Sequence, residues 1–313
     1  MDKKKEEEIL TNIFSKNDYT INSTEEPDFI LLKNDTKEVF GVEVTEIFLT
    51  ESDARLLYIP GYFSNIIDGD KYRNKIDRKV LPVKNATVYS AGIKDNPKDI
   101  KCIIRSVPSR DEVAKIIREA INKKNMKINN YKRKTAKNNL IISDNEHFIK
   151  SKSDLYSSAF NFELVQTIIV SEFEKIYLIT YVGSEMLFYE LKSACFIFLA
   201  FLTLAFVNCF KLDNPQKYHF TLDLLSSIGF KLTSYYSEKE DCIKVKCWNA
   251  IVCFVEKNEE LLIDRIFTNE DVGIEDNFQE FPSSTYDFGD IKDKYLEFLH
   301  SKDLIVDLSK KVT

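Results

Sequence analysis

Two carboxylates near the start of the sequence stand where apolar strand residues are expected. Residues 27–46 read PDFILLKNDTKEVFGVEVTE, which places Asp28 ahead of one apolar run and Glu43 inside a second. Burial of an unpaired carboxylate costs on the order of several kcal/mol, so these residues either face solvent or hold a cation. Two converging carboxylates form the hard, oxygen-rich site that Mg²⁺ or Mn²⁺ prefers.

The strand pattern decides whether the two carboxylates can converge. The apolar runs are separated by the turn-prone KNDTK, which predicts a β-hairpin. Side chains at i and i+2 share a strand face, so Glu43 and Thr45 point one way, whereas Val44 and Glu46 point the other. A hairpin brings Asp28 near Glu43. The alternative is that both acids lie at strand ends in water.

A helix predicted over residues 3–15 adds a third carboxylate. At 100° per residue, Glu6 falls in the middle of the apolar stripe made by Ile9, Leu10, Ile13 and Phe14. We therefore expect Glu6 to face inward. The alternative is that the first turn leaves Glu6 in solvent, near the positive end of the helix dipole.

A long helix predicted over residues 109–131, with SRDE as its N-terminal cap, carries lysines on its apolar face. Lys124, Lys127 and Tyr131 lie on the same stripe as Val113, Ile117, Ala120, Ile121 and Ile128. Lysines in such positions either extend past the core to solvent or offset the negative charge of carboxylates and phosphates.

These elements follow one another in a recognisable order: a helix with a glutamate, PDF, a hairpin to GVEVTE, a long helix and the buried strand NLIISD. Over residues 3–144 this order resembles the PD-(D/E)xK nuclease superfamily, which has the restriction-endonuclease-like fold. The resemblance implies that Asp28 and Glu43 bind Mg²⁺ (or Mn²⁺) and that Glu6 assists from the helix.

The resemblance also implies a lysine two residues after Glu43, where this sequence has Thr45. In some branches of the superfamily that lysine has moved to a neighbouring helix. We therefore expect Lys124 or Lys127 to supply the amine, and Thr45 to hydrogen-bond a metal-bound water. Otherwise the site is inactive.

The expected function is a metal-dependent nuclease that hydrolyses phosphodiester bonds of DNA, suited to bacterial anti-phage defence or restriction. The net charge of −6 argues against non-specific coating of nucleic acid, but residues 110–137 carry ten Lys/Arg against three Asp/Glu. The expected nucleic-acid contacts in this segment are Lys123, Lys132, Arg133 and Lys134. The alternative function is a catalytically inactive restriction-like fold that binds nucleic acid or protein within a defence complex.

The expected fold class is α/β with a mixed α+β sheet, divided along the chain. Residues 1–191 form the restriction-endonuclease-like domain, 192–211 an apolar helix, and 212–313 a smaller α+β domain without a chemical motif. The last segment is expected to bind a protein partner, mediate homo-oligomerisation or regulate. The uncharged stretch Ser193–Phe210 is either a buried helix or a membrane span, since it is at the lower edge of the required length.

Composition removes several other classes. The six cysteines form no C-x-x-C pair and no secretory segment follows MDKKKEEE, so reduced thiols and a cytoplasmic location are expected. Three histidines, none near a cysteine pair, argue against a zinc site. With only eight glycines, neither a P-loop nor a dinucleotide-binding fingerprint is present.

Overall fold

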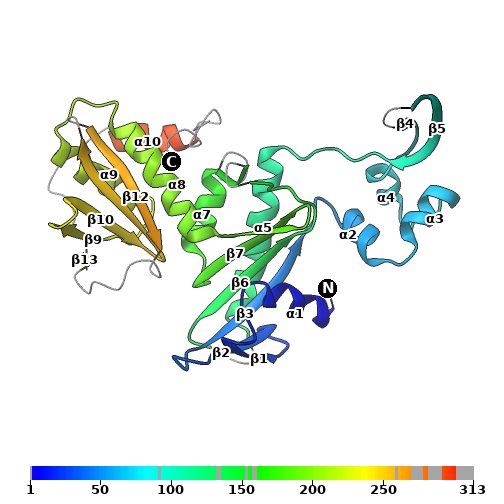
Figure 1. The fold of residues 1–313 in the computed structure, drawn as a ribbon, viewed down its shortest axis with the longest axis horizontal. Coiled ribbons are helices and arrows are strands. Elements are labelled where there is room, and N and C mark those ends of the chain that lie inside the picture. The colour runs from blue at the N-terminus through cyan, green and yellow to red at the C-terminus, as the bar shows by residue number, and fades with distance from the viewer. Residues whose placement is uncertain are drawn as a thin grey trace.

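A six-stranded mixed sheet forms the middle of the molecule. The computed structural model describes residues 2–90, 93–131, 135–151, 154–156, 161–257, 260–268, 278–280 and 291–300. A second sheet with its own helices lies on one side of the central sheet, and an arm of short helices and a hairpin projects from the other (Figure 1). This arrangement confirms the expected α+β class with a smaller C-terminal α+β region.

The central sheet has the strand order β1-β2-β3-β6-β7-β8. Its strands are β1 (Tyr19–Ser23), β2 (Phe29–Lys33), β3 (Val39–Ile47), β6 (Asn138–Asp144), β7 (Lys175–Val182) and β8 (Glu185–Glu190). β3, β6 and β7 are parallel, and the other neighbours are antiparallel. The predicted hairpin is therefore present as β2 and β3, with Phe29 opposite Val42. β1, which pairs with β2 at the edge of the sheet, was not anticipated.

Helices cover both faces of this sheet. On one face lies α1 (Lys3–Thr11), shorter than the predicted helix, with Ile9 and Leu10 packed in a cluster that includes Val42 and Val44. The other face is covered by α5 (Arg110–Ile128) and α7 (Phe162–Val170). α5 begins as expected, since Ser109 forms a capping box with Glu112.

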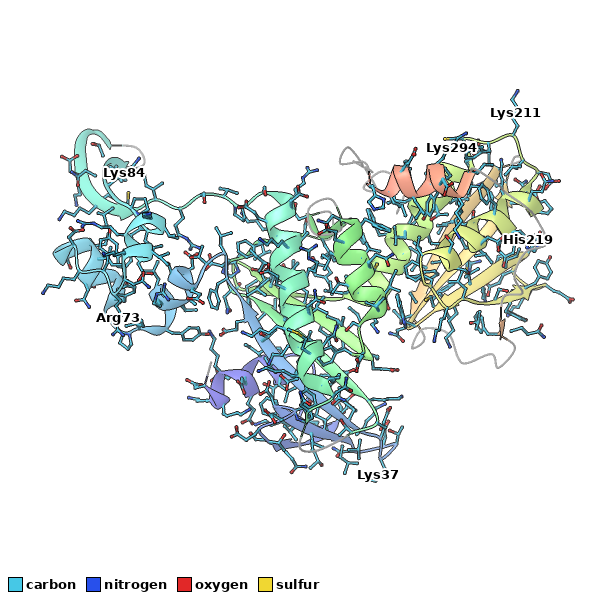
Figure 2. All side chains as sticks on the ribbon, turned by 180° about the vertical axis from the view of Figure 1, so that it is seen from behind. Lys37, Arg73, Lys84, Lys211, His219 and Lys294 are labelled. Carbon is cyan, nitrogen blue, oxygen red and sulfur yellow. The ribbon has the colours of Figure 1, made fainter. Side chains whose placement is uncertain are left out.

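An arm separates β3 from α5 in the chain. It consists of α2 (Glu51–Tyr58), α3 (Tyr62–Gly69), α4 (Lys75–Val80), β4 (Val83–Ser90) and β5 (Ile93–Ile103). The three helices pack around the fully buried Asp77, which accepts hydrogen bonds from Ser52 and Arg55. Figure 2 shows the side chains of the arm, with Arg73 labelled in the connection between α3 and α4 and Lys84 labelled in β4.

The C-terminal region contains a second, antiparallel sheet with the order β12-β11-β10-β9-β13. Its elements are α8 (Leu191–Val207), α9 (Asn214–Ser227), β9 (Thr233–Ser237), β10 (Cys242–Cys247), β11 (Ala250–Lys257), β12 (Glu260–Thr268), β13 (Gln279–Glu280) and α10 (Ile291–His300).

The apolar stretch predicted as a buried or membrane-spanning helix is α8, and 13 of its 17 residues are buried. α8 contacts β7 and α7 on one side and α9, β11 and β12 on the other. In the described part of the chain, no helix combines the length and the apolar character that crossing a bilayer requires. One hydrophobic cluster runs from Ile142 through Phe196 to Val252. The hydrophobic core is therefore continuous from the central sheet through α8 to the second sheet. The expected domain boundaries at 191 and 212 stay a prediction.

Gly41 sets the close approach of β3 to the segment before Asp28. A Cβ at this buried position would lie 2.8 Å from the Pro27 ring and 2.8 Å from the Thr135 hydroxyl, and it would overlap the Asn138 side chain. Only a residue without a side chain fits here.

We predict that Gly41→Ala lowers the free energy of unfolding by about 1–3 kcal/mol, because the added methyl overpacks this contact. Urea denaturation of the full chain measures the change. Gly69→Ala, where the nearest atoms belong to the flexible Lys71 side chain from 3.3 Å outward, is the control. Equal stability of the two variants would contradict the close approach.

Candidate active site between the hairpin and the long helix

Asp28 lies at the point where β2 begins beside β3. The ladder between the two strands starts with Phe29 opposite Val42, while β3 continues to Ile47. The next β3 amide on this edge, that of Val44, donates to Oδ2 of Asp28 at 2.9 Å. The carboxylate of Asp28 therefore replaces a strand partner and is held against the edge of β3.

Glu43 faces α5, and its side chain is only 4% exposed. The ammonium of Lys124, on α5, donates a hydrogen bond to Oε2 of Glu43 and lies 3.8 Å from Oδ2 of Asp28. Lys124 reaches the carboxylates because it continues the buried stripe of Ile117 and Ile121. Two acids from the hairpin and an amine 81 residues further along the chain than Glu43 thus meet in one place.

Burial raises the pKa of Glu43, because the carboxylate is removed from water. The Lys124 ammonium acts against this rise, and the charge of Asp28 adds to it. Tyr131, three residues beyond the end of α5, is 4% exposed, and its pKa is raised by burial and by the charge of Glu43. Burial is the largest cause of both shifts, and the two groups lie close enough for the charge of Glu43 to act on the Tyr131 hydroxyl.

A second ammonium, that of Lys3 in α1, contacts the carboxylates from the other side. Its Nζ lies 2.8 Å from Oε2 of Glu6 and 3.1 Å from Oδ1 of Asp28. Burial acts to lower the pKa of Lys3, but the hydrogen bonds and charges of the two acids outweigh it and raise the pKa. Glu6 faces inward as expected, with its side chain 12% exposed.

The remaining expected residues do not join this cluster. Thr45 lies on the same face of β3 as Glu43 and is partly buried. Lys127 and Lys123 are exposed, so the expectation that Lys127 faces inward is wrong. α5 ends at Ile128, and its last turn no longer buries this position. Lys132, Arg133 and Lys134 lie outside the described residues.

The sequence pattern missed Lys3 and a polar group on the opposite face of β3. There, Oε1 of Glu46 lies 2.8 Å from Nζ of Lys5 and accepts a hydrogen bond from Asn145 at 2.5 Å, while Tyr58 donates to its other oxygen. Burial and the Glu46 carboxylate raise the pKa of Tyr58 to about 12. The alternation of side chains along β3 predicts that Glu46 lies on this face. No sequence pattern indicates that its partner is Lys5 of α1.

The donor set fits a divalent cation of the magnesium type. Asp28 and Glu43 offer hard carboxylate oxygens, and two ammonium groups already stand beside them as cations. Within the residues that the structure describes, no group of three or more His, Cys, Asp and Glu side chains is gathered closely enough to hold a metal ion by itself. Mg²⁺ commonly uses one or two carboxylates and completes its shell with water and substrate phosphate oxygens, so Asp28 and Glu43 suffice.

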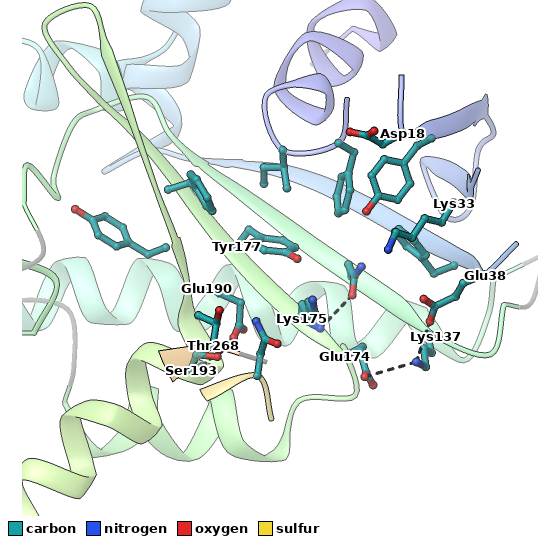
Figure 3. A pocket seen from close by; sticks show the side chains of 18 of the residues that line it. Asp18, Lys33, Glu38, Lys137, Glu174, Lys175, Tyr177, Glu190, Ser193 and Thr268 are labelled. Atoms are coloured by element: carbon teal, nitrogen blue, oxygen red, sulfur yellow. Dashed lines mark hydrogen bonds and ion pairs between the residues drawn. The ribbon is translucent and has the colours of Figure 1, made fainter. Parts of the chain in front are cut away.

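A separate cavity has a volume of about 1070 Å³, and Asp28, Glu43 and Lys124 do not line it (Figure 3). It extends over the α1 face of the sheet beside Tyr177, with Lys33 and Lys137 toward one end and Glu190 and Ser193 toward the other. Its mixed charges indicate no single ligand chemistry.

Comparisons of the chain with protein-family models, with curated proteins and with solved structures find no match.

We predict that Glu43→Gln becomes more stable relative to the wild type as the pH rises from about 4 to 7. A carboxyl whose folded-state pKa is raised contributes its full stability only below its unfolded-state pKa, and loses it as the pH rises through the folded-state value. The amide does not titrate, so the variant escapes this loss.

Urea denaturation across this pH range measures the difference in free energy of unfolding. The same substitution at the exposed Glu119 on α5 controls for the change in net charge. A difference between wild type and Glu43→Gln that is constant with pH would contradict the raised pKa of Glu43 in the folded protein.

Proposed function

We propose that this protein is a metal-dependent nuclease that hydrolyses phosphodiester bonds of DNA. The observation that carries the proposal is the convergence of Asp28, Glu43 and Lys124 at the junction of the β2–β3 hairpin and α5. Two carboxylates that can hold a divalent cation, beside an amine that can contact a phosphate, are what such a reaction needs.

The reaction requires water activation and charge stabilisation. The water oxygen bonds to phosphorus, the bond from phosphorus to the leaving sugar oxygen breaks, and the protons of the water pass to solvent and to the leaving oxygen. A divalent cation, when bound, supplies Lewis-acid chemistry that lowers the pKa of water and offsets charge on the phosphate. Asp28 and Glu43 are the residues that would hold it.

Lys124 supplies the cationic group that the superfamily motif places two residues after the glutamate. Its ammonium donates to Glu43 in this structure and can donate to a phosphate oxygen when a substrate is bound. Tyr131 is buried beside Glu43 and helps to exclude bulk water from this side of the site. Thr45, on the same face of β3, remains a candidate for orienting the attacking water by a hydrogen bond.

The DNA backbone is expected to contact the basic end of α5. Lys123 is exposed one residue before Lys124, so it faces solvent beside the site. Phosphate contacts of this kind make the affinity for DNA fall as the salt concentration increases.

A role in bacterial anti-phage defence or restriction rests on fold-level analogy. All six cysteines are free thiols, and the cytoplasmic location stays a prediction.

A second candidate function is a binding module without catalysis. The observation that favours it is that Lys3 and Lys124 already place an ammonium on each carboxylate of the pair, as a purely structural ion-pair network would. The neutral Thr45 at the motif lysine position favours it as well. In that case the protein binds nucleic acid, or a protein partner or second copy through residues 212–313.

We predict that Lys124→Ala lowers Mg²⁺- or Mn²⁺-dependent cleavage of plasmid DNA by at least about 100-fold, as loss of a group that stabilises transition-state charge does. Asp28→Asn and Glu43→Ala are expected to abolish cleavage. Lys115→Ala, at an exposed lysine nearer the start of the same helix, is the matched control and retains activity.

Circular dichroism and a thermal melt establish that each variant is folded. Metal-dependent cleavage that survives all three substitutions would overturn the assignment. A wild-type protein that binds DNA but cleaves neither DNA nor RNA with either metal would support the binding module instead.

A further inference from the structure

A second cavity lies at the carboxyl ends of the parallel strands β3, β6 and β7. Its volume is about 670 Å³, and we call it the strand-end cavity. Leu49 follows β3, residues 146–148 and Lys150 follow β6, and residues 181–183 include the end of β7. Residues 105–108 and Arg110, at the start of α5, line it as well. Cavities of about 300–1,000 Å³ are typical of small-ligand sites, and ligands of open α/β sheets bind at this end of the strands.

The strand-end cavity is separate from the candidate active site. Arg110, at the first turn of α5, lines the cavity, whereas Lys124 lies at the opposite end of the same helix. At 1.5 Å per residue these positions are about 21 Å apart along the helix axis. Asp28, Glu43 and Lys124 do not line the cavity.

Three cationic side chains from two segments of the chain line this cavity. Arg105 is held in position by two carboxylates: its Nε lies 2.9 Å from Oδ1 of Asp53, and its guanidinium pairs with Glu146. Arg110 and Lys150 are exposed and come from α5 and from the segment after β6. A charged arginine and lysine on one cavity suit an anion, and the fork of an arginine matches a phosphate.

The rest of the lining is mixed: Ser106, Glu146 and His147 are polar, with the Glu146 carboxylate paired to Arg105, and the other side chains are apolar or aromatic and partly open to solvent. Val107 is 92% exposed and Val182 is 41% exposed, and Phe148 and Tyr181 lie beside them with part of each side chain accessible. Apolar and aromatic surfaces of this kind pack against the flat face of a nucleobase. If only a small anion were bound, these apolar side chains would have no part of the ligand to contact.

We propose that the strand-end cavity binds a nucleoside phosphate, with the phosphate on Arg110 and Lys150 and the base on Val107 and Phe148. Two sources share this chemistry: a nucleotide within a nucleic-acid strand, and a free nucleotide. A strand that reaches from the cavity to Lys124 would span about six nucleotides at about 3.4 Å each. The proposal concerns binding and does not depend on cleavage at Asp28 and Glu43.

The test measures binding to the full-length protein in EDTA, so that no metal-dependent cleavage occurs. The probes are AMP, a fluorescein-labelled 12-nucleotide oligodeoxythymidine with a 5′-phosphate, and inorganic phosphate. We expect Arg110→Glu and Lys150→Glu each to weaken binding of AMP, of the oligonucleotide or of both by at least about 10-fold. Lys115→Glu, an exposed lysine on α5 outside the cavity, is expected to leave binding unchanged.

The pattern across probes identifies the source. Oligonucleotide binding well above AMP binding, lost in both cavity variants, assigns the site to a nucleic-acid strand. AMP binding that equals or exceeds oligonucleotide binding, and is lost in the same variants, assigns it to a free nucleotide. The proposal is overturned if neither probe binds, if the cavity variants behave as Lys115→Glu does, or if inorganic phosphate binds as tightly as AMP.

Discussion

The burial of the Glu43 carboxylate is the constraint on which the site and its surroundings depend. A charge that is almost fully removed from water must be compensated by a partner. That partner is the ammonium of Lys124, and Asp28 lies beside the same ammonium. Because Lys124 reaches Glu43 only when Ile117 and Ile121 are seated on the sheet, the packing of α5, the register of β3 and the electrostatics of the site are one interdependent arrangement.

The fold positions these groups through the point at which the hairpin strands separate. β2 starts at Phe29, so β3 has an unpaired edge beyond Val42, and Asp28 occupies that edge by accepting the Val44 amide. The lack of a side chain at Gly41 brings the preceding segment close enough for this contact. On the other side of the sheet, α1 contributes Lys3, whose ammonium lies between the carboxylates of Glu6 and Asp28. Positive and negative side chains therefore alternate from Glu6 through Lys3 to Asp28.

Sequence reasoning succeeded where periodicity or composition was strong. The hairpin, α5 and the inward orientation of Glu6 were predicted from apolar patterns. The helix α8 was predicted as well, but its apolar pattern left a buried helix and a membrane span open. The short helices α2 to α4 were not, because they are organised around Asp77, a buried charge whose partners come from separate turns and produce no periodic signal. The prediction that Lys127 faces inward was wrong because the periodicity of a helix shows which residues share a face, but not where along its length that face stops contacting the sheet. Lys3 was missed because a charged N-terminal turn usually lies in solvent.

The separation in the chain between Glu43 and Lys124 has a consequence for synthesis. The whole arm, from α2 to β5, is synthesised after Glu43 and before Lys124. During that interval the nascent chain contains Asp28 and Glu43 but not yet the lysine that pairs with them. Closing a loop of this length has an entropic cost that only the assembled core can offset. An incomplete chain would therefore carry an unassembled site, and any chemistry there would begin only after tertiary folding.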